Sequence, residues 1–211
     1  MKSDFEIQKE ICEIGRRMYK NGFVAANDGN ITVKVRENEI WATPTGVSKG
    51  YMTSDMLIKV DSNGNVIQGT WKPSSELKMH LRVYKERPDI GAVVHAHPPT
   101  ATGFAVAGIS LDKYTTPEAI LTFGKVPLVP YGTPSTDEIP DAVSKYLQHN
   151  DAFLLENHGA LTVGCDLMDA YFKMETIEIS TKISLVARLL GGERELNSEQ
   201  LEKLLKIKNK K

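Results

Sequence analysis

The chain has 211 residues, of which 41% are hydrophobic and 25% charged, as in a folded globular protein of one domain. Lys and Arg number 26 against 27 for Asp and Glu, and a net charge of -1 gives no electrostatic reason to expect nucleic acid or an anionic membrane surface as the main partner. The longest uncharged run, 98–111, is too short for the roughly 20 apolar residues of a membrane span. With no apolar signal core at the start and only two cysteines, Cys12 and Cys165, we expect a cytoplasmic protein without disulfides.

Residue spacing in the first half of the chain predicts helices and short strands. Ile7, Ile11 and Ile14 recur at helical intervals, so an amphipathic helix is expected to end at the following Asn-Gly pair. In chain order we expect a helix over 4–20, paired strands over 31–35 and 39–42, a strand over 57–60, a turn at 61–64 and a helix over 74–86.

The second half alternates apolar runs of strand length with helical segments. We expect a strand over 90–97, a helix over 100–107, strands over 126–129, 152–155 and 160–163, a helix opening at 135–138, a helix over 166–190 and a last helix after 197–198. Residues 205–211 are predicted to be a frayed tail. Strands joined mostly by turns predict one α/β domain over 1–211, in which helices cover both faces of a largely antiparallel sheet.

Two of the five histidines, His95 and His97, lie two residues apart at the end of the predicted strand 90–97. Side chains alternate across a strand, so both imidazoles are expected to project from one face together with Val93. Two neighbouring imidazoles can bind one divalent ion without rearrangement. The motif alone is equally compatible with two histidines that are hydrogen-bonded or exposed to solvent.

A third histidine favours the metal. His158 follows the apolar run 152–155, so it also lies at a strand end, and Gly159 permits a sharp turn there. Three neutral imidazoles leave coordination positions open on zinc or a similar ion, as in catalytic rather than structural sites. Spacing alone does not bring His158 beside the other two histidines.

Polar residues also gather at other predicted element ends. Ser74, Ser75 and Glu76 open the helix 74–86, where free N–H groups and hydroxyls can bind an anion and a first-turn carboxylate is favoured. His80 lies one turn later, and such a Glu-x-x-x-His pair is more often an ordinary helix surface pair than a metal site. Two loops, 27–30 and 43–46, contain Gly, Asn and Thr, which allow a ligand to approach the backbone, although each loop alone is an ordinary connection.

Taken in order, seven segments resemble the class II aldolase/adducin family. They are DGNITVKV (28–35), TPTGV (43–47), YMTSDMLIKVD (51–61), KPSSELKMH (72–80), AVVHAHPPTA (92–101), VPLVPYGTPST (126–136) and ENHGALTVG (156–164). The resemblance implies a three-layer αβα sandwich around a mainly antiparallel central sheet. It also implies a homotetramer with active sites at subunit interfaces.

The resemblance further implies roles for individual residues. His95, His97 and His158 would bind Zn²⁺, or Mn²⁺ or Co²⁺ in its place, and Glu76 would be the acid/base that also ligates the metal when substrate is absent. The positions that match the phosphate-binding residues are Gly29, Asn30, Thr45, Gly46, Ser74 and Ser75. Tyr114 is the candidate for a tyrosine that a neighbouring subunit supplies to protonate the aldehyde side, whereas His80 and His149 match no ligand position.

The activity that the resemblance implies is retro-aldol cleavage of a small phosphorylated sugar, L-fuculose 1-phosphate or a similar ketose 1-phosphate, to dihydroxyacetone phosphate and an aldehyde. An L-ribulose-5-phosphate 4-epimerase typically has Asp in place of Glu76 and Ser in place of Pro98, and related decarboxylases usually have Thr-Lys-Glu at 74–76. The three histidines and Glu76 argue against a non-catalytic adducin-like interaction module. The phosphate loops argue against simple metal-assisted hydrolysis.

Overall fold

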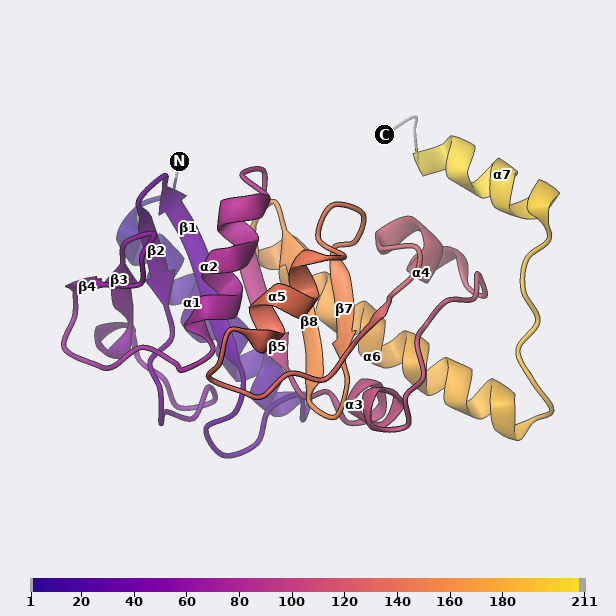
Figure 1. Ribbon diagram of the computed structural model, residues 1–211, viewed down its shortest axis with the longest axis horizontal. Coiled ribbons are helices and arrows are strands. Elements are labelled where there is room, and N and C mark those ends of the chain that lie inside the picture. Colours follow the sequence, from indigo (N-terminus) through magenta and orange to yellow (C-terminus); the bar gives the residue numbers. More distant parts are fainter. Residues whose placement is uncertain (1, 209–211) are drawn as a thin grey trace.

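The computed structural model describes residues 2–208 and contains an eight-stranded sheet (Figure 1). The order of the strands across the sheet is β4-β3-β2-β1-β5-β8-β7-β6, so β1 and β5 occupy its centre and β8 lies on the other side of β5. In chain order the strands are β1 Asn30–Arg36, β2 Glu39–Ala42, β3 Ile58–Val60, β4 Val66–Gln68, β5 Ala92–Ala96, β6 Leu128–Val129, β7 Ala152–Leu155 and β8 Gly159–Gly164.

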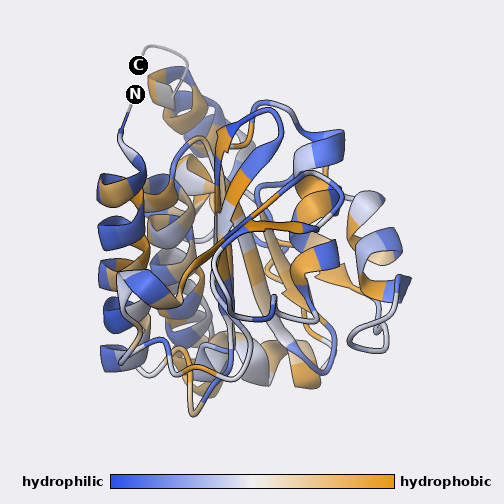
Figure 2. Ribbon diagram, turned by 90° about the vertical axis from the view of Figure 1, so that its left-hand side faces the viewer, coloured by the Kyte–Doolittle hydropathy of each residue, from blue (hydrophilic) through white to orange (hydrophobic). Residues whose placement is uncertain are grey.

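Helices cover both faces of this sheet, as Figure 2 shows from its side. They are α1 Asp4–Lys20, α2 Leu77–Glu86, α3 Pro99–Val106, α4 Pro117–Thr122, α5 Glu138–Ser144, α6 Leu167–Leu189 and α7 Ser198–Lys208, with a 3-10 turn at Ser54–Met56. One apolar core lies under α1, α3 and α6, and a separate core lies under α2 and α5. The αβα layering is therefore confirmed.

The two cores divide strand β5 as its alternation predicts. Ala92, Val94 and Ala96 belong to the core under α1 and α6, whereas Val93 belongs to the core under α2 and α5. His95 follows Val93 by two residues and therefore projects on the α2 side. Val93 and His95 therefore share a face of β5, as predicted, and the His95 imidazole lies on the α2 side of the sheet.

The sheet is mixed, which corrects the expectation of a mainly antiparallel sheet. Strand β6 pairs with β7 in parallel, through Leu128 with Leu154 and Val129 with Leu155. Short turns join β1 to β2, β3 to β4 and β7 to β8, but β6 and β7 are joined by a crossover that contains α5, and this returns the chain in the same direction. Turn-linked strands alone did not reveal that crossover.

Several element boundaries differ from those expected. Strands β4 and β6 have only three and two residues, and α4 lies in the segment 111–123, for which no element was predicted. Helix α2 begins at Leu77 rather than at 74, because Ser74 to Glu76 form a turn in which the Ser74 carbonyl accepts from the Leu77 N–H at 3.1 Å. Glu76 thus precedes the helix instead of lying in its first turn.

The last helix packs against α4, and the Leu196 N–H donates to the Tyr114 carbonyl oxygen at 2.9 Å. Residues 205–208 of the expected frayed tail are helical, and residues 209–211 lie outside the described part of the chain. Within 2–208, no helix combines the length and the apolar character that crossing a bilayer requires.

Candidate metal and substrate site

Antiparallel pairing brings the start of β1, the end of β5 and the start of β8 together at one end of these strands. Asn30 at the start of β1 lies opposite His95 near the end of β5, and Ala96 lies opposite Ala160 at the start of β8. His97 directly follows β5 and His158 directly precedes β8, so this register makes them neighbours across the two strands. The structure thus brings His158 beside the His-x-His pair, which sequence spacing could not establish.

The three imidazoles converge on a common point. Their ring centroids lie 4.7 to 5.2 Å apart, and the Nε2 atoms of His95 and His97 are separated by 3.2 Å. One ring nitrogen of each histidine lies within 4.8 Å of the other two. Ligands at about 2.0–2.1 Å from a tetrahedral zinc ion lie about 3.3 Å from one another, so the His95–His97 separation fits a shared ion.

Hydrogen bonding fixes which nitrogen of His95 faces this point. The His95 Nδ1–H donates to the Ala160 carbonyl oxygen at 2.9 Å, which leaves the Nε2 lone pair directed at the cluster. Burial lowers the pKa of His95 to about 3, and it also lowers the pKa of His97. Both rings are therefore neutral at physiological pH, the form in which imidazole binds a metal.

Glu76 is the acidic group of the cluster. Its Oε1 lies 2.9 Å from His158 Nε2 and its Oε2 lies 3.4 Å from His95 Nε2. The Asn30 side-chain amide donates to Oε2 at 2.7 Å. Burial opposes ionisation, but the hydrogen bonds from His158 and Asn30 favour the charged form and hold the Glu76 pKa well below its usual value, so the carboxyl is ionised.

The predicted phosphate-binding loops meet beside Glu76. Asn30 donates to the Ser74 hydroxyl at 3.4 Å, and that hydroxyl accepts from the Glu76 N–H at 3.3 Å. Pro44 pairs with Pro73 across an isolated bridge, and the Thr45 N–H donates to the Lys72 carbonyl at 3.0 Å. Thr45, Gly46 and Ser75 are exposed on this surface, so their polar groups are accessible to a ligand.

The two glycines of these loops have different environments. Both have positive φ, at 71° for Gly29 and 73° for Gly46. A Cβ at Gly29 would lie 2.6 Å from Val24 Cγ1 and 2.8 Å from the His95 carbonyl oxygen, so packing alone excludes a side chain there. A Cβ at Gly46 would meet nothing within 4 Å, which leaves open space above the loop.

Tyr114 is not among the residues of 2–208 that the structure gathers around the three histidines. Its ring lies 5.0 Å from Lys125 Nζ, and its backbone carbonyl accepts from Leu196. This position on the α4 segment leaves Tyr114 without a role in the site of its own chain.

Sequence reasoning missed two buried polar residues near the site. Lys49 is 1% exposed, and its Nζ donates to the carbonyl oxygens of Asn27 and Val47. His80, expected on a helix surface, is fully buried, its Nδ1 2.8 Å from the Thr32 hydroxyl, and burial lowers its pKa to about 4. Lys49 stands in a polar Ser-Lys-Gly segment that is typical of an exposed turn, so no sequence signal distinguished it.

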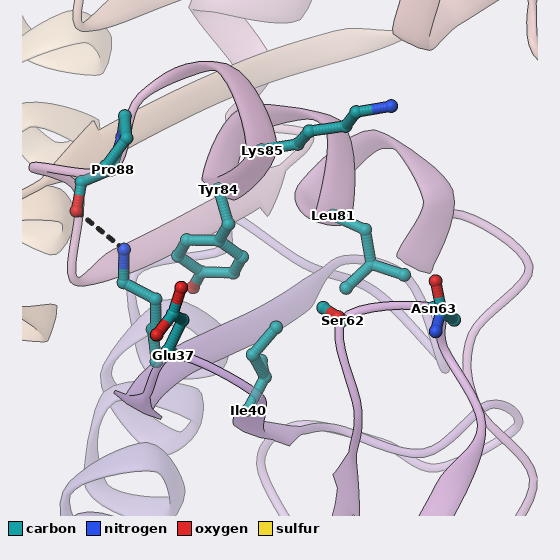
Figure 3. Close-up of a pocket in the computed structure, with 9 residues that line it drawn as sticks. Glu37, Ile40, Ser62, Asn63, Leu81, Tyr84, Lys85 and Pro88 are labelled. Atoms are coloured by element: carbon teal, nitrogen blue, oxygen red, sulfur yellow. Dashed lines mark hydrogen bonds between the residues drawn. The ribbon is translucent and has the colours of Figure 1, made fainter.

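A cavity of about 510 Å³ lies away from the histidines, at the other end of α2 (Figure 3). Tyr84 and Leu81 of α2 face turns that contain Glu37, Ser62 and Asn63, and the Lys34 ammonium donates to the Pro88 carbonyl at 2.7 Å. None of the predicted site residues lines it. The groups predicted to bind a metal ion or accept a proton lie in the histidine cluster, not in this cavity.

The family model that matches this chain is the Class II Aldolase and Adducin N-terminal domain, which aligns with residues 9–185. The chain therefore belongs to the class II aldolase/adducin family. This confirms the family that the seven sequence segments indicated.

Curated relatives that match this chain include proteins of two different activities. An L-fuculose phosphate aldolase of Methanococcus maripaludis is 36% identical over 177 residues, which cover 84% of this chain and 95% of the relative. A 3-oxo-tetronate 4-phosphate decarboxylase of Haemophilus influenzae is 34% identical over 182 residues, which cover 83% and 86%. A solved L-fuculose 1-phosphate aldolase superposes with a TM-score of 0.89 at 29% identity, covering 96% of this chain and 95% of its own. Both activities are those of lyases that break a carbon–carbon bond.

We expect Gly159→Ala to disturb the histidine cluster through the backbone. A Cβ at this position would lie 2.5 Å from the Ala96 carbonyl oxygen and 2.5 Å from His97 Cδ2, so β8 and β5 must separate. Overpacking of this kind costs about 1–3 kcal/mol. Urea denaturation and a zinc titration should show lower stability and weaker binding of the ion.

Gly103→Ala is the matched control, because a Cβ at this position in α3 would meet nothing within 4 Å. We expect its stability to equal that of the wild type or to exceed it by up to about 1 kcal/mol, since alanine is the better helix former. Equal behaviour of the two variants would contradict the close approach of β8 to β5.

Proposed function

We propose that this protein is a metal-dependent lyase that cleaves a phosphorylated sugar to dihydroxyacetone phosphate and an aldehyde, with L-fuculose 1-phosphate or a similar ketose 1-phosphate as the substrate. The observation that carries the proposal is the contact of an ionised carboxylate, Glu76, with two of three converging histidines. The proposed metal site and the base lie together at one end of β1, β5 and β8, and the phosphate loops adjoin them.

His95, His97 and His158 are the residues that would hold the ion, which we propose to be Zn²⁺, with Mn²⁺ or Co²⁺ as substitutes. The directed Nε2 of His95 and the 3.2 Å separation from His97 support this assignment. A divalent ion bound by three imidazoles supplies a Lewis acid that stabilises negative charge developing on a substrate oxygen. Glu76 can complete the ligand set when no substrate is bound, because its oxygens lie at the same centre.

Glu76 is the group that would move the proton. Its carboxylate is ionised and therefore able to accept a proton from the hydroxymethyl carbon of dihydroxyacetone phosphate, or to return one during cleavage. Asn30 holds the Oε2 atom at 2.7 Å, and the Ser74 hydroxyl holds the Glu76 backbone N–H. These two hydrogen bonds orient the carboxylate before substrate arrives, which reduces the ordering needed during the reaction.

The phosphate would be held by Gly29, Asn30, Thr45, Gly46, Ser74 and Ser75. Asn30 and Ser74 contact each other, and the Pro44–Pro73 bridge joins the 43–46 loop to the same surface. Contacts with a phosphate remote from the breaking bond provide binding energy that positions the sugar.

The identity of the leaving fragment separates two candidate reactions. An aldolase releases an aldehyde, whereas a decarboxylase acting on a 3-oxo-tetronate 4-phosphate releases carbon dioxide. Both leave the enediolate of dihydroxyacetone phosphate, so the same base, metal site and phosphate loops serve either reaction. A relative with each activity aligns with more than 80% of this chain. Ser74-Ser75-Glu76 in place of Thr-Lys-Glu favours the aldolase.

We expect His95→Ala, His97→Ala and His158→Ala each to lose most of the bound ion and all measurable cleavage activity while remaining folded, because each change removes one ligand. His149→Ala, at an exposed position on the same chain, should retain both. Metal content per chain by mass spectrometry, with circular dichroism as the check on folding, measures the difference. The assignment fails if the wild type takes up no zinc, manganese or cobalt.

We expect Glu76→Gln to slow proton exchange by about 10²–10⁴-fold, the usual contribution of general acid–base catalysis, because the amide cannot accept a proton. The measurement is deuterium incorporation into dihydroxyacetone phosphate in deuterated water, followed by NMR without any aldehyde. Glu138→Gln is the control, since Glu138 is exposed and contacts the Thr133 N–H instead. Unchanged exchange in Glu76→Gln would remove Glu76 from the chemistry.

An L-ribulose-5-phosphate 4-epimerase should exchange this proton poorly and a binding module not at all, so the wild-type rate separates these alternatives from a lyase. Cleavage of L-fuculose 1-phosphate, compared with release of carbon dioxide from 3-oxo-tetronate 4-phosphate, then identifies the leaving fragment. Faster turnover of the second compound would favour the decarboxylase.

We also propose a homotetramer, in which a tyrosine from a neighbouring subunit, with Tyr114 as the candidate, completes the aldehyde side. Exposed apolar residues on the C-terminal half of α6 support association. These residues are Ile179, Ile183, Leu185, Val186, Leu189 and Leu190. Light scattering should give four times the 23.4 kDa of one chain, and Ile183→Lys should lower it; a fully active monomer would contradict the proposal.

A further inference from the structure

Lys49 joins the two loops that the proposed function assigns to the substrate phosphate. Its ammonium group donates to the Asn27 carbonyl at 3.1 Å and to the Val47 carbonyl at 2.7 Å. Asn27 begins the 27–30 loop, and Val47 directly follows the 43–46 loop. The side chain is 1% exposed, so a positive charge lies buried directly behind this surface.

The surroundings of Lys49 differ from those of the other two buried lysines in the described chain. Lys59 contacts Asp4 and Glu39, and Lys173 contacts Asp151 and Asp169, so each of these ammonium groups is neutralised by two carboxylates. The hydrogen-bond partners of Lys49 within residues 2–208 are carbonyl oxygens, which carry no net charge. Among the residues that the structure describes, Lys49 therefore has no carboxylate in hydrogen-bond contact, and a buried charge that is only partly compensated is costly, which points to further compensation by a ligand.

The charged groups that act on Lys49 are both acidic: Asp28 lies in the 27–30 loop, and Glu76 is the carboxylate of the histidine cluster. Burial lowers the Lys49 pKa to about 8, and the charges of Asp28 and Glu76 oppose that shift. Helix α1 approaches the Lys49 backbone through Gly15, which carries no charge. Two of the three ammonium N–H donors are used by the carbonyls, and one remains.

We propose that Lys49 is the positive counter-charge for the phosphate group of the substrate, and that it aligns the two loops whose neutral donors contact that phosphate. The inference rests on the proposed function, because it takes the loops as the phosphate site. Asn30, Thr45, Ser74 and Ser75 offer hydrogen bonds but no charge, whereas a phosphate carries close to two negative charges. Lys49 supplies the missing charge from below the loops, and no Arg or Lys cluster is needed on the surface.

Calorimetric titration with inorganic phosphate tests the proposal on metal-loaded protein. We expect Lys49→Met to weaken phosphate binding by at least about 10-fold, the scale of a charge interaction at an effective dielectric constant near 20. Lys173→Met removes another buried lysine, which is paired with carboxylates elsewhere, and it should change phosphate affinity less than about 2-fold. An equal loss in the two variants would overturn the proposal, because it would indicate general destabilisation.

A second readout separates charge from loop geometry. Proton exchange is measured with dihydroxyacetone phosphate and with unphosphorylated dihydroxyacetone, and the ratio of the two kcat/KM values is compared between variants. In Lys49→Met this ratio should fall by at least about 10-fold, because only the phosphorylated compound carries the charge. A constant ratio would assign Lys49 a purely structural role and overturn the proposal.

The wild type provides a test that does not depend on folding of a variant. Phosphate stabilises the protonated ammonium, so it raises the Lys49 pKa, and affinity should fall as pH rises above about 8. Titrations near pH 8.5 in two buffers of different ionisation heat should therefore show proton uptake in the wild type and none in Lys49→Met. Wild type that binds no phosphate would overturn the proposed function as well, whereas phosphate binding without proton uptake would overturn this inference alone.

Discussion

The register of β5 against its two antiparallel neighbours is the constraint on which the rest of the structure depends. It places Asn30 of β1 opposite His95 and brings the start of β8, with His158, to the end of β5. A slip of one residue in β5 would turn His95 to the opposite face, toward the core under α1 and α6. Glycine at 159 allows β8 to approach β5 as closely as this arrangement requires. Backbone pairing, more than any contact between histidines, assembles the site.

Hydrogen bonds then hold the site in a reactive arrangement. Ala160 fixes the orientation of the His95 ring, Asn30 fixes one oxygen of Glu76, and Ser74 fixes the Glu76 backbone. Each partner comes from an element already fixed by the sheet or by the turn before α2. The carboxylate and the imidazoles can thus differ in charge while lying in contact, since the surrounding groups favour an ionised acid and neutral rings.

Sequence periodicity gave the long helices, the 31–42 hairpin and the shared face of Val93 and His95, because these depend only on local spacing. It could not give the position of His158 relative to His97, which depends on the pairing of two strands more than 60 residues apart in sequence. Strand β4 was not predicted because three residues show no period, whereas β6 lies within the predicted strand 126–129 and is shorter than it. Lys49 and His80 were missed for a different reason: burial of a polar residue is decided by tertiary packing, and local composition at both positions is typical of a surface.

Because three segments of the chain converge at the site, an ion bound there would also stabilise the fold. The turn before α2, the end of β5 and the start of β8 meet at one end of the strands through Glu76 and three histidines, whose ring nitrogens lie within 4.8 Å of one another. An ion bound there ties these segments together only in the folded chain. At a free concentration 1,000 times its dissociation constant, such an ion adds about 4.1 kcal/mol to the free energy of unfolding. That is a large share of the free energy of unfolding of a typical domain, which is roughly 5–15 kcal/mol. The supply of metal would therefore govern the lifetime of the protein in a cell as well as its catalytic rate.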